Sequence, residues 1–433
     1  MNGASANLCR VPAHRLEAAV VLCAFCRRWG RQRGQSVAHV LFFAFDIAEA
    51  AQIRRIESVR KLGHDVASVS FRRTNMNRDF TPDWPDLPLG RTENGKLMLR
   101  LKSLGVGLAR LLGQRRIAEG RTIWIARNLD MLALAVLFRR LTGRRDVRLT
   151  YECLDIHGLM TRRDVVGRVA RWIERRLMAR TDLLIVSSPG FIDRYFHPVQ
   201  GYRGQVAIIE NKLWTGEGPL PRRARPKDTG GPLVLGWVGS LRCPASLALL
   251  EAVARDMGDD IRLVFRGSVH RHALPGFDAV IARHSNMHYG GTYEYPHGLA
   301  QVYVACDLVW SQDLWQAGTN SDWLLPNRIY EASYFGCPSV AVRHTVPGQR
   351  IEASGLGFTI QEPTPAALSA LLRRLSRAEN HACAAGLLRQ PDTDFRLTLG
   401  ELETALAPLF SGGRPRSGEL SPVAANSGES LGA

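Results

Sequence analysis

Continuous apolar runs alternate along this chain with stretches of helical period. Residues 39–46 (HVLFFAFD) form a continuous apolar run that ends in Asp46, which is typical of a parallel strand buried on both faces, and residues 65–71 (DVASVSF) predict a second strand. Between them, residues 49–62 have a helical period and end before Gly63, a residue suited to the position after a helix. Further strands are predicted at 121–128, 148–155, 181–188, 206–214, 233–238, 261–267 and 339–342. Strands that alternate with helices predict an α/β fold built on parallel sheets.

Two other stretches have patterns of a different kind. Residues 74–95 contain three prolines and few periodic apolar positions, which predicts a loop.

In residues 165–179 the apolar side chains recur at the spacing of one helix face: Val166, Val169, Ala170, Ile173 and Leu177. Arg168, Arg171 and Arg175 form a stripe on another side. This helix either packs its apolar face on the core and leaves the arginines solvated, or meets anionic lipid.

Candidate chemistry is densest in residues 324–342, LLPNRIYEASYFGCPSVAV. Pro326 suits the first turn of a helix, and a Gly-Cys-Pro stop leads directly into an apolar strand. The helix start carries Asn327 and Arg328, so free backbone N–H groups and a cation are available to a phosphate. One turn on, Glu331 can accept hydrogen bonds from two neighbouring hydroxyls. A nucleotide's diphosphate and ribose require these groups.

The run PNRIYEASYFGCPSVAV resembles the sugar-nucleotide-binding segment of GT-B-fold glycosyltransferases, approximately P-x-K/R-x-x-E-A-x-A-x-G-x-P-V-V-A. Many members of this group build bacterial polysaccharides. Glu331 matches the donor-binding glutamate, whereas Trp323 stands where many members have a second glutamate. The resemblance spans residues 37–410, and within it the chain is similar to exopolysaccharide biosynthesis enzymes of the succinoglycan type. It implies an α/β GT-B fold, with two Rossmann-like doubly wound domains facing a cleft.

The resemblance and the composition together predict a domain organisation. A Gly, Pro and charge-rich stretch, TGEGPLPRRARPKDTGGP, is typical of an interdomain linker. The predicted parts are an N-terminal extension (1–36), an acceptor-side Rossmann-like domain (37–214), this linker (215–232), a sugar-nucleotide-binding Rossmann-like domain (233–392), a helix returning to the first domain (393–410) and a disordered tail (411–433). For the extension, an interfacial anchor is the alternative.

A second group of donor-site candidates opens the later domain. Residues 233–257 predict a strand, a Gly-Ser turn and a helix. Gly239 lets the backbone approach a ligand, and Arg242 lies at the helix entrance, where N–H groups and a guanidinium can bind a diphosphate together. The resemblance implies a further lysine that this chain lacks, so we expect Arg328 and Arg266 to supply the second charge.

Asp155 and His157, in YECLDIHGL, follow a predicted strand of the first domain. The carboxyl ends of parallel strands are where open α/β sheets bind ligands. In the family that this chain resembles, an acidic or His residue from this region faces the cleft. Either residue could act as the general base that takes a proton from an acceptor hydroxyl. The alternative is a structural pair, with the aspartate capping the next helix and the histidine packing nearby.

Charge and cysteine content narrow the partners. The chain has 57 Lys and Arg against 40 Asp and Glu, so its net charge of +17 favours an anionic partner. The arginines lack the aromatic interleaving of a base-stacking platform, which argues against nucleic acid. Eight scattered cysteines, including a CxxC pair at Cys23 and Cys26, form neither a disulfide framework nor a zinc pattern. No apolar run reaches the length of a membrane-spanning helix.

We therefore predict a metal-independent hexosyltransferase without a cofactor. It moves a sugar from a UDP- or GDP-sugar to a hydroxyl of a polyprenyl-diphosphate-linked oligosaccharide. The expected location is the cytoplasm, peripherally on the anionic inner face of the cytoplasmic membrane. The alternatives are a catalytically inactive GT-B scaffold, suggested by Trp323, and a basic nucleic-acid-binding protein.

Overall fold

The computed structural model describes residues 37–73, 79–92, 97–216, 218–222 and 230–410. The predicted N-terminal extension with its CxxC pair, and the predicted tail, lie outside the described residues. The chain forms two compact units, one of residues 1–126 and 134–148, the other of residues 127–133 and 149–433. The second unit contains all of the candidate site residues.

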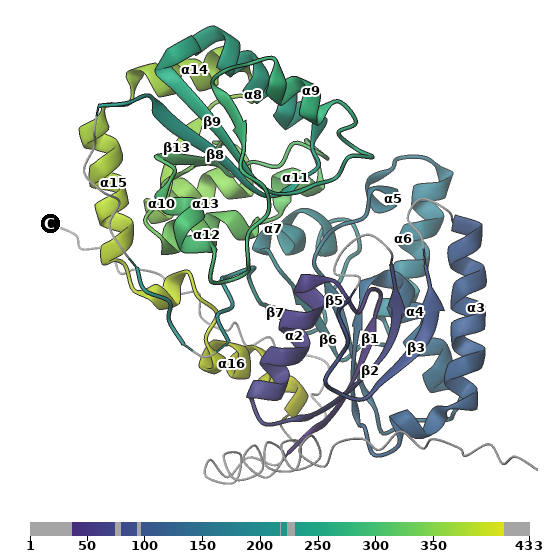
Figure 1. The fold of residues 1–433 in the computed structure, drawn as a ribbon. Helices are drawn as coiled ribbons and strands as arrows, with labels where there is room; N and C mark the ends of the chain where they lie inside the picture. Colours follow the sequence, from purple (N-terminus) through teal and green to yellow (C-terminus); the bar gives the residue numbers. More distant parts are fainter. Residues whose placement is uncertain (1–36, 74–78, 93–96, 217, 223–229, 411–433) are drawn as a thin grey trace, which may run out of the picture. The chain divides into compact units, whose positions relative to one another are not determined.

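The first sheet has seven strands in the order β3-β2-β1-β4-β5-β6-β7 (Figure 1). The strands are β1 (His39–Ala44), β2 (Asp65–Arg72), β3 (Asp86–Arg91), β4 (Ile123–Arg127), β5 (Arg148–Cys153), β6 (Leu183–Val186) and β7 (Val206–Ile208). The helices between them are α2 (Ala50–Lys61), α3 (Leu97–Gly113), α4 (Asn128–Leu141), α5 (Gly158–Thr161), α6 (Val165–Met178) and α7 (Pro189–Phe191). This strand order, with helical crossovers, is that of a doubly wound α/β fold.

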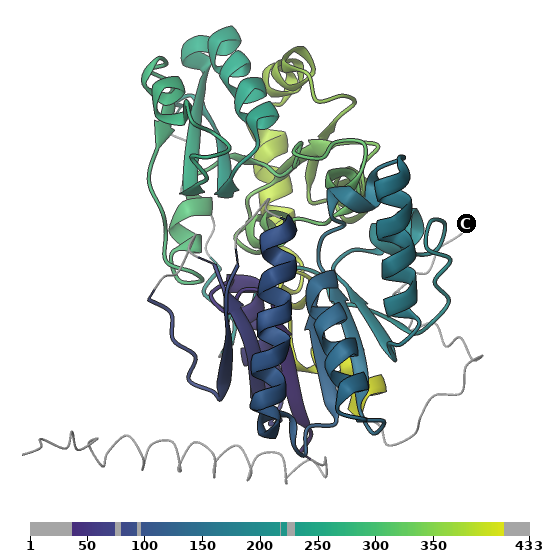
Figure 2. The same cartoon turned by 90° about the vertical axis from the view of Figure 1, so that its right-hand side faces the viewer.

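β3 corrects the prediction of a loop over residues 74–95. β3 pairs with β2 alone, so Pro88 lies in an edge strand, where a missing N–H is tolerated. A register shift at Ser70 and Phe71 accommodates the irregular strand. α3 runs along β3 (Figures 1 and 2), and a Cβ on its Gly107 would lie 2.7 Å from the Phe71 ring. The sequence pattern missed β3 because a proline-bearing edge strand lacks a continuous apolar run.

The second sheet has six strands in the order β10-β9-β8-β11-β12-β13, and all of the pairings are parallel. Its strands are β8 (Leu233–Leu241), β9 (Ile261–Val269), β10 (Met287–Tyr289), β11 (Leu308–Trp310), β12 (Ser339–Val342) and β13 (Gly357–Ile360). Its helices are α8 (Pro244–Met257), α9 (Phe277–Ala282), α10 (Leu299–Val304), α11 (Asn320–Trp323), α12 (Asn327–Tyr334), α13 (Val346–Ser354), α14 (Pro365–Arg374) and α15 (Arg377–Arg389). α16 (Leu399–Phe410) contacts β7 and starts six residues later than the predicted helix.

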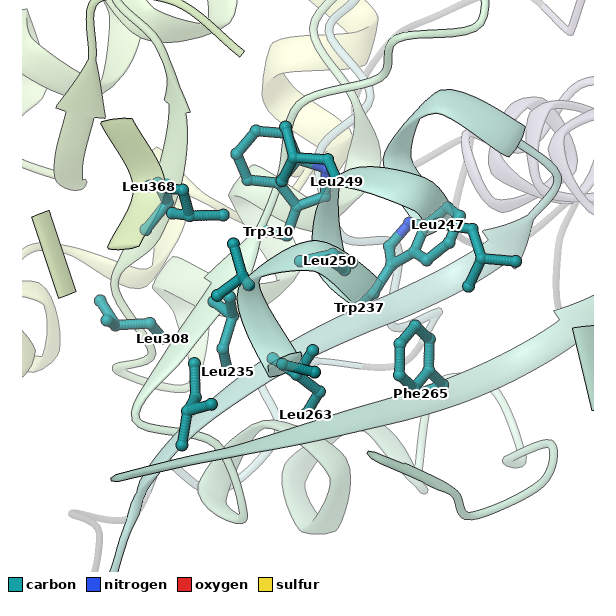
Figure 3. Close-up of a cluster of buried hydrophobic side chains, with 14 of the residues drawn as sticks. Leu235, Trp237, Leu247, Leu249, Leu250, Leu263, Phe265, Leu308, Trp310 and Leu368 are labelled. Atoms are coloured by element: carbon teal, nitrogen blue, oxygen red, sulfur yellow. The ribbon is translucent and has the colours of Figure 1, made fainter. Parts of the chain in front are cut away.

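The core of the second sheet explains why its strands carry large apolar side chains. Side chains from β8, β9 and β11 meet those of α8 and α14 in one buried cluster (Figure 3). The labelled members are Leu235, Trp237, Leu247, Leu249, Leu250, Leu263, Phe265, Leu308, Trp310 and Leu368. Burying one such side chain contributes about 1.5–3 kcal/mol. The cluster fixes the strands whose carboxyl ends carry the donor-site candidates.

α6 contradicts the interpretation of residues 165–179 as a helix with its apolar face on the core. Val166, Val169 and Ile173 are exposed, and the residues that α6 buries are Gly167, Glu174 and Met178. The Glu174 carboxylate accepts hydrogen bonds from the hydroxyls of Tyr151 and Tyr195 and from the Gln200 amide. Helical period alone could not reveal this orientation, because it depends on tyrosines from other elements.

Replacing Glu174 by alanine is expected to lower the free energy of unfolding by about 3 kcal/mol, because two buried hydroxyls lose their acceptor. Burial raises the pKa of Glu174, although the three hydrogen bonds oppose the shift. The folded state therefore holds this proton more tightly than the unfolded chain. Stability from this group is complete below the ordinary glutamate pKa and is lost as pH rises through the raised value.

Urea unfolding followed by circular dichroism across that pH window measures both effects. Glu174→Gln, which cannot ionise, is the matched control and is expected to lack the pH-dependent difference. An alanine variant as stable as the parent would contradict the assigned network.

Among the described residues, no helix is both long and apolar enough to cross a membrane.

Candidate functional site

Two glycines bring the ends of β8 and β9 close together. Gly239 and Gly267 are register partners, with φ of +105° and +123°. A Cβ on Gly267 would lie 2.0 Å from the Gly239 carbonyl oxygen, so a larger residue cannot occupy the position without moving backbone. β8 continues to Leu241, which corrects the predicted Gly-Ser turn. Gly239 therefore presents its backbone at the carboxyl edge of the second sheet, where parallel α/β sheets bind ligands.

Arg242 lies at the entrance of α8, directly before the N-cap residue Cys243. Its side chain is 42 % exposed, and its guanidinium contacts the Asp313 carboxylate at 3.4 Å between Nη2 and Oδ2. Beside it, His270 Nε2 lies 2.8 Å from Ser240 Oγ. Burial lowers the pKa of His270, and the charges of Arg242 and of a neighbouring histidine lower it further. The lowered pKa favours a neutral His270 imidazole beside the cationic Arg242.

Glu331 is buried in the second turn of α12, with 6 % of its surface exposed. The Tyr303 hydroxyl donates to Glu331 Oε2 at 3.0 Å. Burial raises the pKa of Tyr303 well above its ordinary value, and the Glu331 charge adds to this while Arg328 opposes it. The tyrosine therefore stays a hydrogen-bond donor that orients the carboxylate. α12 begins at Asn327, as predicted, and Pro326 is its N-cap residue rather than part of its first turn.

The two remaining donor-site arginines lie along the same edge. Arg328 Nη1 donates to the carbonyl of Trp310, the last residue of β11, at 3.4 Å. Arg266 packs on Gly290, where an added Cβ would lie 2.7 Å from its Cδ, and donates to the Thr292 carbonyl at 3.4 Å. Each arginine is anchored by a backbone carbonyl rather than by a carboxylate, so its charge remains available to an anion.

Tyr293 connects these groups. A Cβ on Gly239 would lie 4.0 Å from the Tyr293 hydroxyl, and the charge of Tyr293 contributes to the raised pKa of Tyr303. Gly239 therefore lies close to Tyr293, and Glu331 and Arg328 lie close to Tyr303. Ser240 and Arg242 both lie beside His270, and Arg266 contacts the carbonyl of Thr292, which precedes Tyr293.

Asp155 and His157 follow β5 and are both exposed. Asp155 Oδ1 accepts from the Asn320 side-chain amide at 3.1 Å, and Asn320 Oδ1 accepts from the backbone N–H of Ile156 at 2.7 Å. His157 is the N-cap residue of α5, and its Nδ1 accepts from the Leu159 N–H at 3.2 Å. The structural alternative assigned capping to the aspartate, and this is wrong because the histidine caps the helix.

Asn320 is a residue that the sequence pattern did not single out. It begins α11, and only 5 % of its surface is exposed. Its paired hydrogen bonds link the β5 end to the segment preceding α12, within the second unit. Trp323, at the end of α11, accepts from the Ser188 hydroxyl through its carbonyl. No sequence signal identifies such contacts, because their partners lie more than 130 positions apart.

No group of three His, Cys, Asp or Glu side chains suited to a metal occurs in the part of the chain that the structure describes. His270 and His272 have ring centroids 5.6 Å apart, without such a third ligand. Cys153, Cys243, Cys306 and Cys337 are buried.

Comparison with known proteins identifies the relatives of this chain. No family model matches it. Over 344 residues it is 34% identical to the succinoglycan biosynthesis protein ExoL of Rhizobium meliloti (strain 1021). The matched residues cover 78% of this chain and 84% of ExoL. The chain belongs to the ExoL family. This membership confirms the predicted similarity to exopolysaccharide biosynthesis proteins of the succinoglycan type.

Solved structures similar to this ExoL family member show its fold. Anabaena Alr3699/HepE, in complex with UDP and glucose, has a TM-score of 0.62 at 14% identity over 86% of this chain and 98% of that one. A sucrose-phosphate synthase from Thermosynechococcus elongatus has a TM-score of 0.61 at 13% identity, over 86% and 95%. WaaG, a glycosyltransferase involved in lipopolysaccharide biosynthesis, has a TM-score of 0.57 at 14% identity, over 86% and 100%. The predicted GT-B fold, with two parallel-sheet Rossmann-like parts, is confirmed.

Proposed function

We propose that the protein is a hexosyltransferase of exopolysaccharide biosynthesis. It transfers a sugar from a UDP- or GDP-sugar to a hydroxyl of a polyprenyl-diphosphate-linked oligosaccharide. Membership of the ExoL family supports the process, and the GT-B fold supports the reaction class. The observation that carries the proposal is the buried Glu331 carboxylate, oriented by Tyr303 and flanked by Arg328 at the carboxyl edge of the second sheet.

The donor occupies this edge in the proposal. Glu331 accepts hydrogen bonds from two ribose hydroxyls, while Asn327 and the first turn of α12 offer backbone N–H groups. Arg328 and Arg242, with Arg266 nearby, bind the diphosphate and stabilise the charge that develops on the leaving group. This arrangement needs no metal ion and no cofactor, because guanidinium groups supply the positive charge. HepE, a structural relative, was solved with UDP and glucose.

The acceptor reacts beside the end of β5. Its hydroxyl oxygen forms a bond to the anomeric carbon, and the bond from that carbon to the diphosphate oxygen breaks. The hydroxyl proton passes to Asp155 or His157, and the nucleoside diphosphate leaves with the electron pair. The exposed Asp155, held by Asn320, supports this assignment.

A lipid-linked acceptor places the enzyme peripherally at the inner face of the cytoplasmic membrane. The net charge of +17 supports an anionic membrane surface as a partner. Nucleic acid is not a partner in this proposal, because the net charge alone would suggest nucleic-acid binding.

The decisive experiment incubates the full chain with labelled UDP- and GDP-sugars and a bacterial lipid extract, with and without EDTA. Label is expected in the lipid fraction with one donor, at the same rate in both arms. A control with Glu331→Gln is expected to show little transfer. Transfer from no donor, with no binding of UDP or GDP by calorimetry, would overturn the proposal in favour of an inactive scaffold. Loss of transfer with EDTA would remove metal independence alone.

A further inference from the structure

The outer face of α6 is apolar. Of the thirteen exposed large hydrophobic side chains among the described residues, five lie within nine positions of this helix. Their exposed fractions are 61 % for Val165, 53 % for Val166, 50 % for Val169, 54 % for Trp172 and 41 % for Ile173. At 100° per residue these positions fall on one side of the helix, opposite the buried Gly167, Glu174 and Met178. A helix whose outer side meets only water is not expected to carry its valines, isoleucine and tryptophan on that side.

The outward orientation is fixed by contacts on the inner side. Glu174 accepts from three buried donors, which a rotated helix would leave without an acceptor. A Cβ on Gly167 would lie 2.3 Å from the Arg162 carbonyl oxygen, so the helix start is packed too closely to turn. Arg171 and Arg175 donate to the backbone carbonyls of neighbouring segments, among them those of Met160 and Gln200. The apolar stripe therefore cannot join the core and has to be covered by something else.

The charges around the stripe indicate what covers it. The exposed basic residues on and next to α6 are Arg162, Arg163, Arg168, Arg175, Arg176 and Arg180. The Arg176 guanidinium lies over the Trp172 ring, 5.3 Å from its centroid. Asp164, which is paired with Arg162, is the exposed acidic residue of this segment. An apolar stripe with a tryptophan, bordered by arginines, is the pattern of a helix that lies in the headgroup region of an anionic bilayer.

We propose that α6 is the surface by which this protein docks on an anionic membrane. Val165, Val166, Val169, Trp172 and Ile173 enter the boundary between headgroups and acyl chains, while the bordering arginines meet lipid phosphates. The inference deepens the proposed function, since it rests on the lipid-linked acceptor for its biological purpose. The docking itself needs neither donor nor acceptor, so it is measured independently.

The test is co-sedimentation of the full chain with vesicles of phosphatidylglycerol and phosphatidylcholine, or of phosphatidylcholine alone. The parent is expected to bind the anionic vesicles and to release from them at high salt. Val169→Gln combined with Trp172→Gln is expected to lower the bound-to-free ratio at least tenfold. Ile208→Gln, at another exposed apolar position on β7, is the matched control and is expected to bind like the parent. Arg168→Gln with Arg176→Gln is expected to weaken binding and reduce its salt dependence.

Equal vesicle binding by the parent and the Val169/Trp172 variant, with unchanged circular dichroism, would overturn the inference. A parent that ignores vesicles but forms a dimer lost in this variant would replace it with a contact between copies. Vesicle binding without sugar transfer would leave the inference intact and refute the proposed function. Transfer to an extracted acceptor by a protein that never binds vesicles would support the proposed function and refute the inference.

Discussion

Replacing Glu331 by glutamine is expected to lower kcat/KM for the nucleotide sugar by about 10²–10³-fold, chiefly through the donor KM. In our proposal the carboxylate accepts from two ribose hydroxyls, and each hydrogen bond to a charged group contributes about 1.5–3 kcal/mol. Glutamine keeps one acceptor but presents an N–H₂ group to the second hydroxyl. Calorimetric binding of UDP and GDP, together with initial rates of transfer, measures the loss.

The glutamine variant is preferred to alanine because Glu331 also accepts from the buried Tyr303 hydroxyl. Alanine would leave that hydroxyl without this acceptor, which would mix a stability loss with the loss of donor binding. Tyr303→Phe tests orientation alone, since it leaves the carboxylate and removes its tyrosine donor. Glu362→Gln, at an exposed glutamate, is the matched control. Unchanged donor affinity in a folded Glu331→Gln protein would exclude Glu331 from the donor site.

The elements with strong local signals were predictable from the sequence. The strand residues 339–342 and the helix from Asn327 match β12 and α12, because capping, the glycine stop and the apolar run act within a few residues. The same holds for β1, whose continuous apolar run reflects burial on both faces. Local patterning was sufficient wherever one element's own residues decide its structure.

The failures occurred where partners distant in the sequence decide the structure. α6 has a strong helical period, but the buried Glu174 network turns its apolar side outward. β3 forms because β2 offers an unpaired edge, although Pro88 interrupts its pattern. Asn320 is buried by its hydrogen bonds to Asp155 and Ile156, residues that a single sequence does not place beside it. Of the candidate site, the residue types were visible in the sequence and the residues that orient them were not.

The choice between Asp155 and His157 as general base follows from the hydrogen bonds of the histidine. His157 Nδ1 accepts from the Leu159 N–H, so a neutral ring carries its proton on Nε2. The ring can take up a proton only at Nδ1, whose lone pair already accepts from the Leu159 N–H, so protonation would break the helix cap. Asp155 is exposed, and the Asn320 amide orients its carboxylate. We therefore expect Asp155 to be the base.

Asp155→Asn is expected to lower kcat by about 10²–10⁴-fold, the usual contribution of a general base, with the donor KM little changed. His157→Gln is expected to lower kcat by less than tenfold, because glutamine also offers an oxygen to the helix start. Asn320→Ala, which removes the positioning amide, is expected to fall between the two and to reduce kcat rather than raise KM for donor. Steady-state kinetics of the three variants, each checked for an unchanged thermal midpoint, separates the roles. A larger loss in His157→Gln than in Asp155→Asn would reassign the proton to the histidine, and full activity in both would place the base elsewhere.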